Sequence, residues 1–202
     1  LDAREKLNAK SIVLTPCGHG YRVLRWEAER MLGKSFSFPV YTFSELLDRF
    51  LENGQIQLNK DAFEGPVTYH DPCNYGRKSM KAFGVAYYEE GRIITKKCTI
   101  DYKEMEPNRE SNYCCGAGGG AWAMPFAPER VFYGRIKARQ LQETGAELVI
   151  APCHNCRDQI MKSLNQEYDL GIEVKYLWEL VADSLVLPGQ KQEEIETEEV
   201  GE

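Results

Sequence analysis

The sequence lacks several features that would point to common classes of protein. No apolar run approaches the roughly 20 residues that a helix needs to span a bilayer, and no run rich in Lys and Arg marks a nucleic-acid surface. The 31 acidic residues outnumber the 25 basic ones, so the net charge is −6, which also argues against nucleic acid. The sequence shows no secretory signal peptide. The seven cysteines cluster in loops beside prolines and glycines, which favours a reducing compartment with metal ligation over a secreted disulfide scaffold. We therefore expect a globular protein of the cytoplasm that binds no nucleic acid and could associate with a membrane through partner subunits.

Cysteines are few, but five of the seven gather in three short loops. Cys73 is followed after 40 residues by the adjacent pair Cys114 and Cys115, and Cys153 comes 37 residues later and opens a Cys-x-x-Cys motif that ends at Cys156. Adjacent cysteines cannot easily bond to each other, yet they can bind neighbouring irons of one cluster. Glycines after the pair would let the backbone approach a cluster and turn N–H groups toward its sulfurs; the three that we assign to cofactor binding are Gly116, Gly118 and Gly119.

One arrangement recurs three times along the chain: an apolar strand, then x-Pro-Cys, then a helix. The copies span Ile12–Cys17, Val67–Cys73 and Leu148–Cys153. Strands that alternate with helices predict an α/β fold with a parallel, Rossmann-like sheet. The cysteines would then emerge at the carboxyl edge of the strands, where open α/β sheets place their ligands.

The remaining elements are predicted from helix caps and short apolar runs. Thr42 and Glu45 resemble a capping box, and Gly33 and Gly145 suit helix ends. Residues 86–112 show no sustained period, and the acidic tail after Pro188 is expected to be disordered. We predict helices at the start of the chain and over 21–32, 45–51, from 75, from Pro128, from 154 and over 178–185, and further strands over 39–43 and 172–176.

Five thiolates at one edge need a cation, and the iron of a cluster would supply it. Arg77, Lys78 and Arg157 lie just beyond the cysteine loops and could offset the remaining negative charge. Zinc is the main competing metal, but only one Cys-x-x-Cys pair exists, where four-ligand zinc sites usually take two. A disulfide or a redox switch is the other alternative. The common ferredoxin spacing C-x2-C-x2-C is absent, so the pattern does not describe an ordinary cubane site.

All three histidines lie beside these loops, at His19, His70 and His154. Because histidine titrates near neutrality, one of them could protonate a departing thiolate, and His19 and His154 are the better candidates. Cys17 would line the same edge without holding a metal, in redox or substrate contact. Cys98 has no glycine or proline turn beside it, and we expect it to be dispensable.

The segments Asp71–Arg77, Cys114–Gly120 and Pro152–Cys156 together resemble the cysteine-rich "CCG" domain of heterodisulfide reductase catalytic subunits, over roughly residues 10–180. In that family the five cysteines of a complete motif hold a noncubane [4Fe-4S] cluster, on which a disulfide is cleaved in one-electron steps. The resemblance implies that the ligands here are Cys73, Cys114, Cys115, Cys153 and Cys156.

The chain departs from the family pattern in its first half. Family members commonly hold two such motifs in pseudo-repeat, whereas here Cys17-Gly18-His19-Gly20 stands where a Cys-x-x-Cys would. We therefore divide the chain into a degenerate or truncated first half (1–62), a complete CCG half (63–187) and the acidic tail (188–202). The Cys-Gly-His form is similar to the single-cluster branch with the DsrK-type subunits. Those relatives carry an N-terminal ferredoxin domain, so we expect this chain to be a C-terminal piece of a longer subunit.

The resemblance implies an iron–sulfur oxidoreductase that reduces a disulfide or trisulfide, on a small sulfur-carrier protein or a low-molecular-weight disulfide. His19, Cys17 and His154 would be the catalytic candidates, and the other subunits of a membrane redox complex would be its redox partners. One alternative is an electron conduit of the kind found in lactate, glycolate and glycerol-3-phosphate oxidation complexes. Another is a non-catalytic docking domain that a metal merely stabilises.

Overall fold

A computed structural model describes residues 2–14, 16–118 and 120–187. The acidic tail that we expect to be disordered lies outside the described residues, as does Gly119. Among the helices of the described ranges, none combines the length and the apolar character that a membrane span requires.

Five short strands form two parallel sheets in the described ranges. β1 (Ile12–Leu14) pairs with β2 (Val40–Thr42), while β3 (Val67–Tyr69), β4 (Leu148–Ile150) and β5 (Glu173–Lys175) pair in that order. β3 and β4 are buried throughout, as expected of parallel strands that are covered on both faces. The parallel α/β class predicted from the sequence is confirmed.

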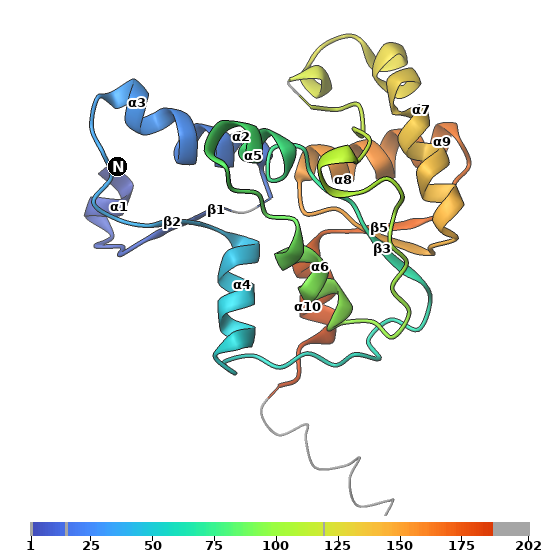
Figure 1. The fold of residues 1–202 in the computed structure, drawn as a ribbon, viewed down its shortest axis with the longest axis horizontal. Coiled ribbons are helices and arrows are strands. Elements are labelled where there is room, and N and C mark those ends of the chain that lie inside the picture. Colours follow the sequence, from blue (N-terminus) through green and yellow to red (C-terminus); the bar gives the residue numbers. More distant parts are fainter. Residues whose placement is uncertain (1, 15, 119, 188–202) are drawn as a thin grey trace, which may run out of the picture.

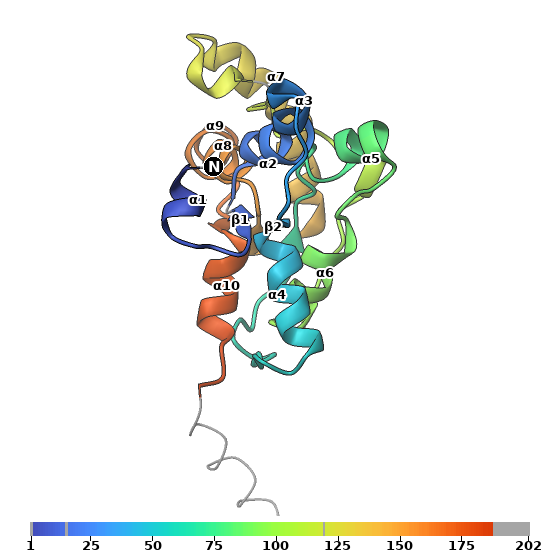
Figure 2. The same cartoon turned by 90° about the vertical axis from the view of Figure 1, so that its left-hand side faces the viewer.

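Helices cover the strands on two sides, as Figures 1 and 2 show. In both views α4, α6 and α10 lie on one side and α2, α7 and α8 on the other. The helical elements are α1 (Asp2–Lys6), α2 (Gly18–Arg22), the π-helical η1 (Val23–Glu27), α3 (Ala28–Leu32), α4 (Phe43–Glu52), α5 (Arg77–Phe83), α6 (Glu89–Lys96), the 3-10 turns η2 (Arg109–Ser111) and η3 (Ala121–Ala123), α7 (Ala127–Thr144), α8 (His154–Gln159), the π-helical η4 (Ile160–Leu164), α9 (Asn165–Glu167) and α10 (Leu177–Ser184).

The local signals in the sequence position most of these elements correctly. Thr42 and Glu45 form the expected capping box at the start of α4. Gly33 and Gly145 each adopt a left-handed conformation, with φ of 64° at both, and end α3 and α7. That conformation favours glycine because it has no Cβ.

Two expectations differ from the structure. Residues 86–112, which show no period, contain α6, whose buried face includes the charged Arg92 and the polar Thr95, so no apolar stripe announces it. Helical periodicity also predicts an apolar side on α7 at Val131, Ile136 and Leu141, but this is wrong at Ile136, which is 45% exposed. The buried face of α7 instead carries a glycine, a lysine and a glutamine among its apolar residues.

The same order of elements occurs twice. β1, a Pro-Cys turn, the helix α2–η1–α3, β2 and α4 are matched by β4, a Pro-Cys turn, the helix α8–η4–α9, β5 and α10. In both copies the helix after the cysteine passes through one π-helical segment. At the start of the last helix of each copy, a glutamate side chain accepts the backbone N–H of the residue three positions before it. π-helical segments are rare and often lie near functional sites. The Pro-Cys turns are therefore equivalent positions in two copies of one architecture.

Candidate metal centre

Three chain segments meet at the carboxyl ends of the strands and line one cavity. Cys73 follows β3, the Cys114–Cys115 pair lies between η2 and η3, and Cys153 and Cys156 stand at the start of α8. All five line this cavity. Cys115, Cys153 and Cys156 are buried, whereas Cys73 is half-buried and Cys114 is exposed. The cysteines therefore lie at the sheet edge that the parallel order predicts, and Cys114 marks its accessible side.

The sulfurs contact one another in a continuous chain, in the order 73, 114, 115, 156, 153. The Sγ atoms of Cys115 and Cys156 are 3.4 Å apart. Hydrogen bonds from Cys115 and Cys73 strongly lower the pKa of Cys114, and the bond from Cys156 lowers the pKa of Cys153 to about 6. The bond to Cys114 raises the pKa of Cys115 to about 12. Thiolate character therefore concentrates at Cys114 and Cys153, as metal ligation requires.

Glycines let the backbone come close to these sulfurs. The Gly116 N–H donates to Cys114 Sγ at 3.4 Å, and a Cβ at Gly116 would lie 2.6 Å from the Arg130 carbonyl oxygen. Gly118 lines the cavity, and Gly18 gives a backbone hydrogen bond that helps to lower the pKa of Cys153. Of the three glycines expected to bind a cofactor, Gly116 and Gly118 adjoin the thiols, and Gly119 lies outside the described residues.

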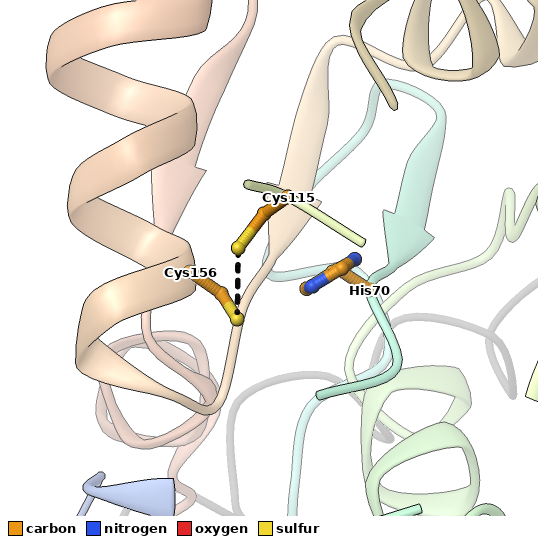
Figure 3. A group of neighbouring side chains, drawn as sticks. All are labelled: His70, Cys115 and Cys156. Atoms are coloured by element: carbon orange, nitrogen blue, oxygen red, sulfur yellow. Dashed lines mark hydrogen bonds between the residues drawn. The ribbon is translucent and has the colours of Figure 1, made fainter. Parts of the chain in front are cut away.

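His70 lies against the buried part of the cavity. One ring nitrogen and the sulfurs of Cys115 and Cys156 all lie within 4.8 Å of one another, and Figure 3 shows the ring beside the two thiols. Burial, followed by the charge of Lys137, lowers the pKa of His70, so the ring is neutral. Its Nδ1 has no hydrogen-bond partner among the described residues. This neutral nitrogen is a potential ligand that our choice of His19 and His154 passed over.

The two histidines favoured from the sequence occupy different places. His19 lines the cavity, and its Nδ1 lies 3.1 Å from Asn155 Nδ2. This contact orients the ring and leaves Nε2 as the nitrogen that does not face Asn155. His154 is half-buried but is not among the cavity-lining residues. Its backbone N–H donates to the Pro16 carbonyl at 2.6 Å and so joins the two Pro-Cys turns.

The remaining two cysteines lie apart from the chain of sulfurs. Cys17 caps α2, where its Sγ accepts the Gly20 N–H at 3.2 Å, and it is not among the residues that line the cavity. It is still near the site, because its charge contributes to raising the pKa of Tyr75 together with Cys153. Cys98 is fully buried in the apolar cluster formed around β3, β4 and α10.

The basic residues expected to offset thiolate charge also differ among themselves. Lys78 lies close enough to Cys73 to oppose the rise of its pKa. Arg77 donates instead to the backbone carbonyl of Asn112, which fixes the segment before Cys114. Arg157 is held in ion pairs with acidic side chains, so its charge is already matched.

A buried polar network behind the cavity has no signal in the sequence. Arg92 forms a bidentate pair with Asp71 at 2.6 Å and also binds Glu104. Asn112 donates to the Asp71 carbonyl at 2.8 Å and accepts from Lys137 at 2.5 Å. These bonds tie the segment before Cys73 to the segment before Cys114, so the network sets the relative position of two cysteine loops.

The donor set fits a soft, multi-metal group. The thiols lie against one another without forming a disulfide, and the histidine nitrogen beside them lacks a partner among the described residues. Thiolates favour iron–sulfur clusters and zinc over hard cations such as magnesium or calcium. Five sulfurs exceed the four ligands of a tetrahedral zinc site, which favours a cluster.

Comparison with known proteins agrees with this donor set. Residues 67–161 match the family described as "Cysteine-rich domain" (CCG). The chain is 29% identical over 188 residues to a subunit of the dihydromethanophenazine:CoB–CoM heterodisulfide reductase of Methanosarcina barkeri, and the match covers 93% of this chain and 44% of that protein.

Two further relatives are named as parts of other oxidoreductases. The chain is 30% identical over 152 residues to the EtfAB:quinone oxidoreductase of Syntrophomonas wolfei, covering 75% of this chain and 20% of that protein. It is 28% identical over 159 residues to the Hdr-like menaquinol oxidoreductase iron-sulfur subunit 2 of Archaeoglobus fulgidus, covering 74% and 27%. The chain thus spans less than half the length of these relatives. It carries a cysteine-rich domain of the CCG family over residues 67–161, and its relatives include subunits of heterodisulfide reductase and Hdr-like iron–sulfur subunits.

Proposed function

We propose that this chain is an iron–sulfur oxidoreductase subunit that reduces a disulfide or trisulfide presented by a partner sulfur-carrier protein. The single observation that carries the proposal is the convergence of five thiols on one cavity with an accessible side at Cys114. The match to a heterodisulfide reductase subunit supports the reaction class. A low-molecular-weight disulfide is the alternative substrate.

Five cysteines would hold a noncubane [4Fe-4S] cluster, and their backbone surroundings suit that role. The Gly116 N–H group and the α8 backbone point at sulfur atoms, which stabilises thiolate ligands. When bound, such a cluster supplies electrons one at a time for cleavage of a sulfur–sulfur bond. The ligands are Cys73, Cys114, Cys115, Cys153 and Cys156.

His19 would supply a proton to a departing thiolate. Complete reduction of R–S–S–R′ consumes two electrons and two protons and releases two thiols. The electrons come from a redox partner subunit. The Asn155 side chain would orient the ring through its contact with Nδ1, and the imidazolium form of His19 would give its proton to the departing thiolate in the cavity region. Cys17, at the cap beside His19, is proposed to contact the substrate, and His154 remains the second candidate acid.

The metal is tested by anaerobic purification followed by iron, sulfide and EPR analysis. We expect about four irons with matching sulfide and a signal that changes when a thiol or disulfide ligand is added. Stoichiometric zinc without sulfide would overturn the cluster assignment, and His70 with Cys115 and Cys156 would then be the first ligands to test.

The proton donor is tested by comparing two variants, each of which changes one histidine to glutamine. His19→Gln should slow reduction of the partner disulfide while leaving the EPR signal intact. His154→Gln serves as the matched comparison because His154 is the neighbour of Cys153 but does not line the cavity. If His19→Gln reduced the partner disulfide at the normal rate, His19 would have no role in the mechanism. If only His154→Gln were slow, His154 would be the proton donor instead.

A second candidate function is that of an electron conduit, which the match to an EtfAB:quinone oxidoreductase favours. Three of the five cysteines are buried, which suits electron transfer without a sulfur substrate. No EPR response of the loaded protein to any thiol or disulfide would favour this conduit. In either role we propose that the chain works with redox partner subunits, and the names of the relatives suggest attachment to a membrane through such partners.

A further inference from the structure

Lys137 is a fully buried lysine on the inner face of α7. Its Nζ donates to Asn112 Oδ1 at 2.5 Å, to Gln140 Oε1 and to Met105 Sδ at 3.5 Å. All three partners are neutral. Within the ranges that the structure describes, Lys137 takes part in no ion pair. A buried ammonium group without a counter-ion is strongly unfavourable, so its presence calls for a nearby negative charge.

The neighbouring carboxylate, Asp71, is already paired with an arginine. Asp71 acts on Lys137 electrostatically, but both of its carboxylate oxygens bind Arg92 at 2.6 Å. Arg92 also binds Glu104, so one arginine and two carboxylates leave one net negative charge, and the Glu104 side chain is 25% exposed to water. A second source of negative charge for Lys137 lies in another direction.

The cysteine cavity is that direction. Burial lowers the pKa of Lys137 to about 7, and the charges of Cys115, Cys156 and Cys114 act against this lowering. The hydrogen-bond path is short, because Asn112, which accepts from Lys137 Nζ, stands two residues before Cys114. Lys137 also contributes to lowering the pKa of His70 on the cavity wall.

We propose that Lys137 is the built-in counter-cation of the metal centre, and that its charge raises the reduction potential of that centre. The inference rests on the proposed iron–sulfur function. Lys137 is a positioning residue in this role, since it acts through the five cysteine ligands and touches no substrate. The exposed basic residues near the loops cannot replace it, because water screens their charges.

The physical reason is the sign of the charge change on reduction. One electron adds one negative charge to the centre, and no covalent bond of the chain forms or breaks. A fixed positive charge in a buried, low-dielectric position favours the more negative, reduced state. Loss of the lysine charge should therefore make the centre harder to reduce and its iron easier to remove.

The test uses the full chain, reconstituted anaerobically with iron and sulfide, and an EPR-monitored potentiometric titration with dithionite. Lys137→Met removes both the charge and the donor, whereas Lys137→Gln removes the charge but keeps an amide donor for Asn112. Lys162→Gln is the matched control, because it removes one lysine charge from a side chain that is 53% exposed. Circular dichroism of the metal-free variants checks that each one folds.

We expect both Lys137 variants to shift the midpoint potential to more negative values by similar amounts, and to lose iron to a chelator faster. Lys162→Gln should keep the potential and the rate of iron loss of the unmodified chain. Unchanged midpoint potentials in both Lys137 variants would overturn the proposal. A shift in Lys137→Met alone would also overturn it, because that pattern would show an effect of hydrogen bonding and not of charge. Absence of iron and sulfide from the unmodified chain would instead overturn the proposed function itself.

Discussion

Gly134 offers the sharpest test of how the protein holds its adjacent cysteines. It lies in α7, where alanine would normally gain about 1 kcal/mol of helix stability over glycine. A Cβ at Gly134 would, however, lie 2.9 Å from the Cys115 carbonyl oxygen and 2.5 Å from Leu164 Cδ2. Leu164 is fully buried, and the Cys115 oxygen belongs to the backbone, so neither atom can move aside freely.

Gly134→Ala should therefore destabilise the metal-free protein and displace the Cys115 loop. Overpacking of a core typically costs about 1–3 kcal/mol, which exceeds the gain in helix propensity, so we expect a net loss of up to about 2 kcal/mol. The free energy of unfolding is measured in urea, and the retained iron is measured after anaerobic reconstitution.

The matched control for this substitution is Gly20→Ala in α2. There the nearest atom to a new Cβ is Cys17 Cβ at 3.5 Å, an ordinary contact, so this variant should be equally or more stable than the unmodified protein. If Gly134→Ala were as stable as Gly20→Ala and held as much iron, the close contact between α7 and the cysteine loop would not constrain the site.

The remaining predictions concern other parts of the molecule. Cys98→Ser should keep its iron and change the stability by only about 1 kcal/mol, because the buried hydroxyl keeps Ser184 as a hydrogen-bond partner, whereas Cys73→Ser should lose iron on reconstitution. Arg92→Met should destabilise the metal-free protein by about 3–5 kcal/mol in urea, because it leaves Asp71 buried and unpaired. The pKa of Lys137 is about 7 in the folded protein and 10.5 in its ordinary state. Between these pH values the unfolded chain binds more protons than the folded one, so the free energy of unfolding rises with pH. At about 1.4 kcal/mol for each pKa unit, this rise reaches on the order of 5 kcal/mol. The free energy of unfolding in urea, measured at pH 7 and pH 10, should show the rise in the unmodified protein and not in Lys137→Met. If Lys137→Met showed the same rise as the unmodified protein, the assignment would be refuted.

The sequence predicts the sheet and the cysteine loops because their signals are local. An apolar run followed by Pro-Cys ends a strand and begins a helix, and it does so at Cys17, Cys73 and Cys153. Parallel order then places the turns at Cys73 and Cys153 at one edge of their sheet without knowledge of any long-range contact, whereas the turn at Cys17 follows a strand of the other sheet. We still only propose that residues 1–62 are a truncated copy of the domain, and the repeated order of elements supports this proposal.

The residues behind the cavity escape prediction because their signals are not local. Lys137 and Asn112 are 25 positions apart and Arg92 and Asp71 are 21 apart, and only the fold brings each pair together. A lysine or arginine on an amphipathic helix is normally placed on the solvent side. At α6 and α7 this rule reverses, because each buried cation has a polar or charged partner in the loops that precede the cysteines.

The two copies of the strand–Pro-Cys–helix architecture explain why the described residues form one cavity lined by several cysteines and not two. Position by position, Cys17-Gly18-His19-Gly20 matches Cys153-His154-Asn155-Cys156, so glycine replaces the second thiol in the first copy. With one thiol at its helix, and that thiol engaged as a cap, the first copy offers no second set of ligands in the described ranges. It contributes a side chain instead: His19 and Asn155 occupy equivalent positions and contact each other at 3.1 Å. The first copy thus places a histidine in the cavity to which the second copy contributes Cys153 and Cys156, as our proposal of His19 as the proton donor requires.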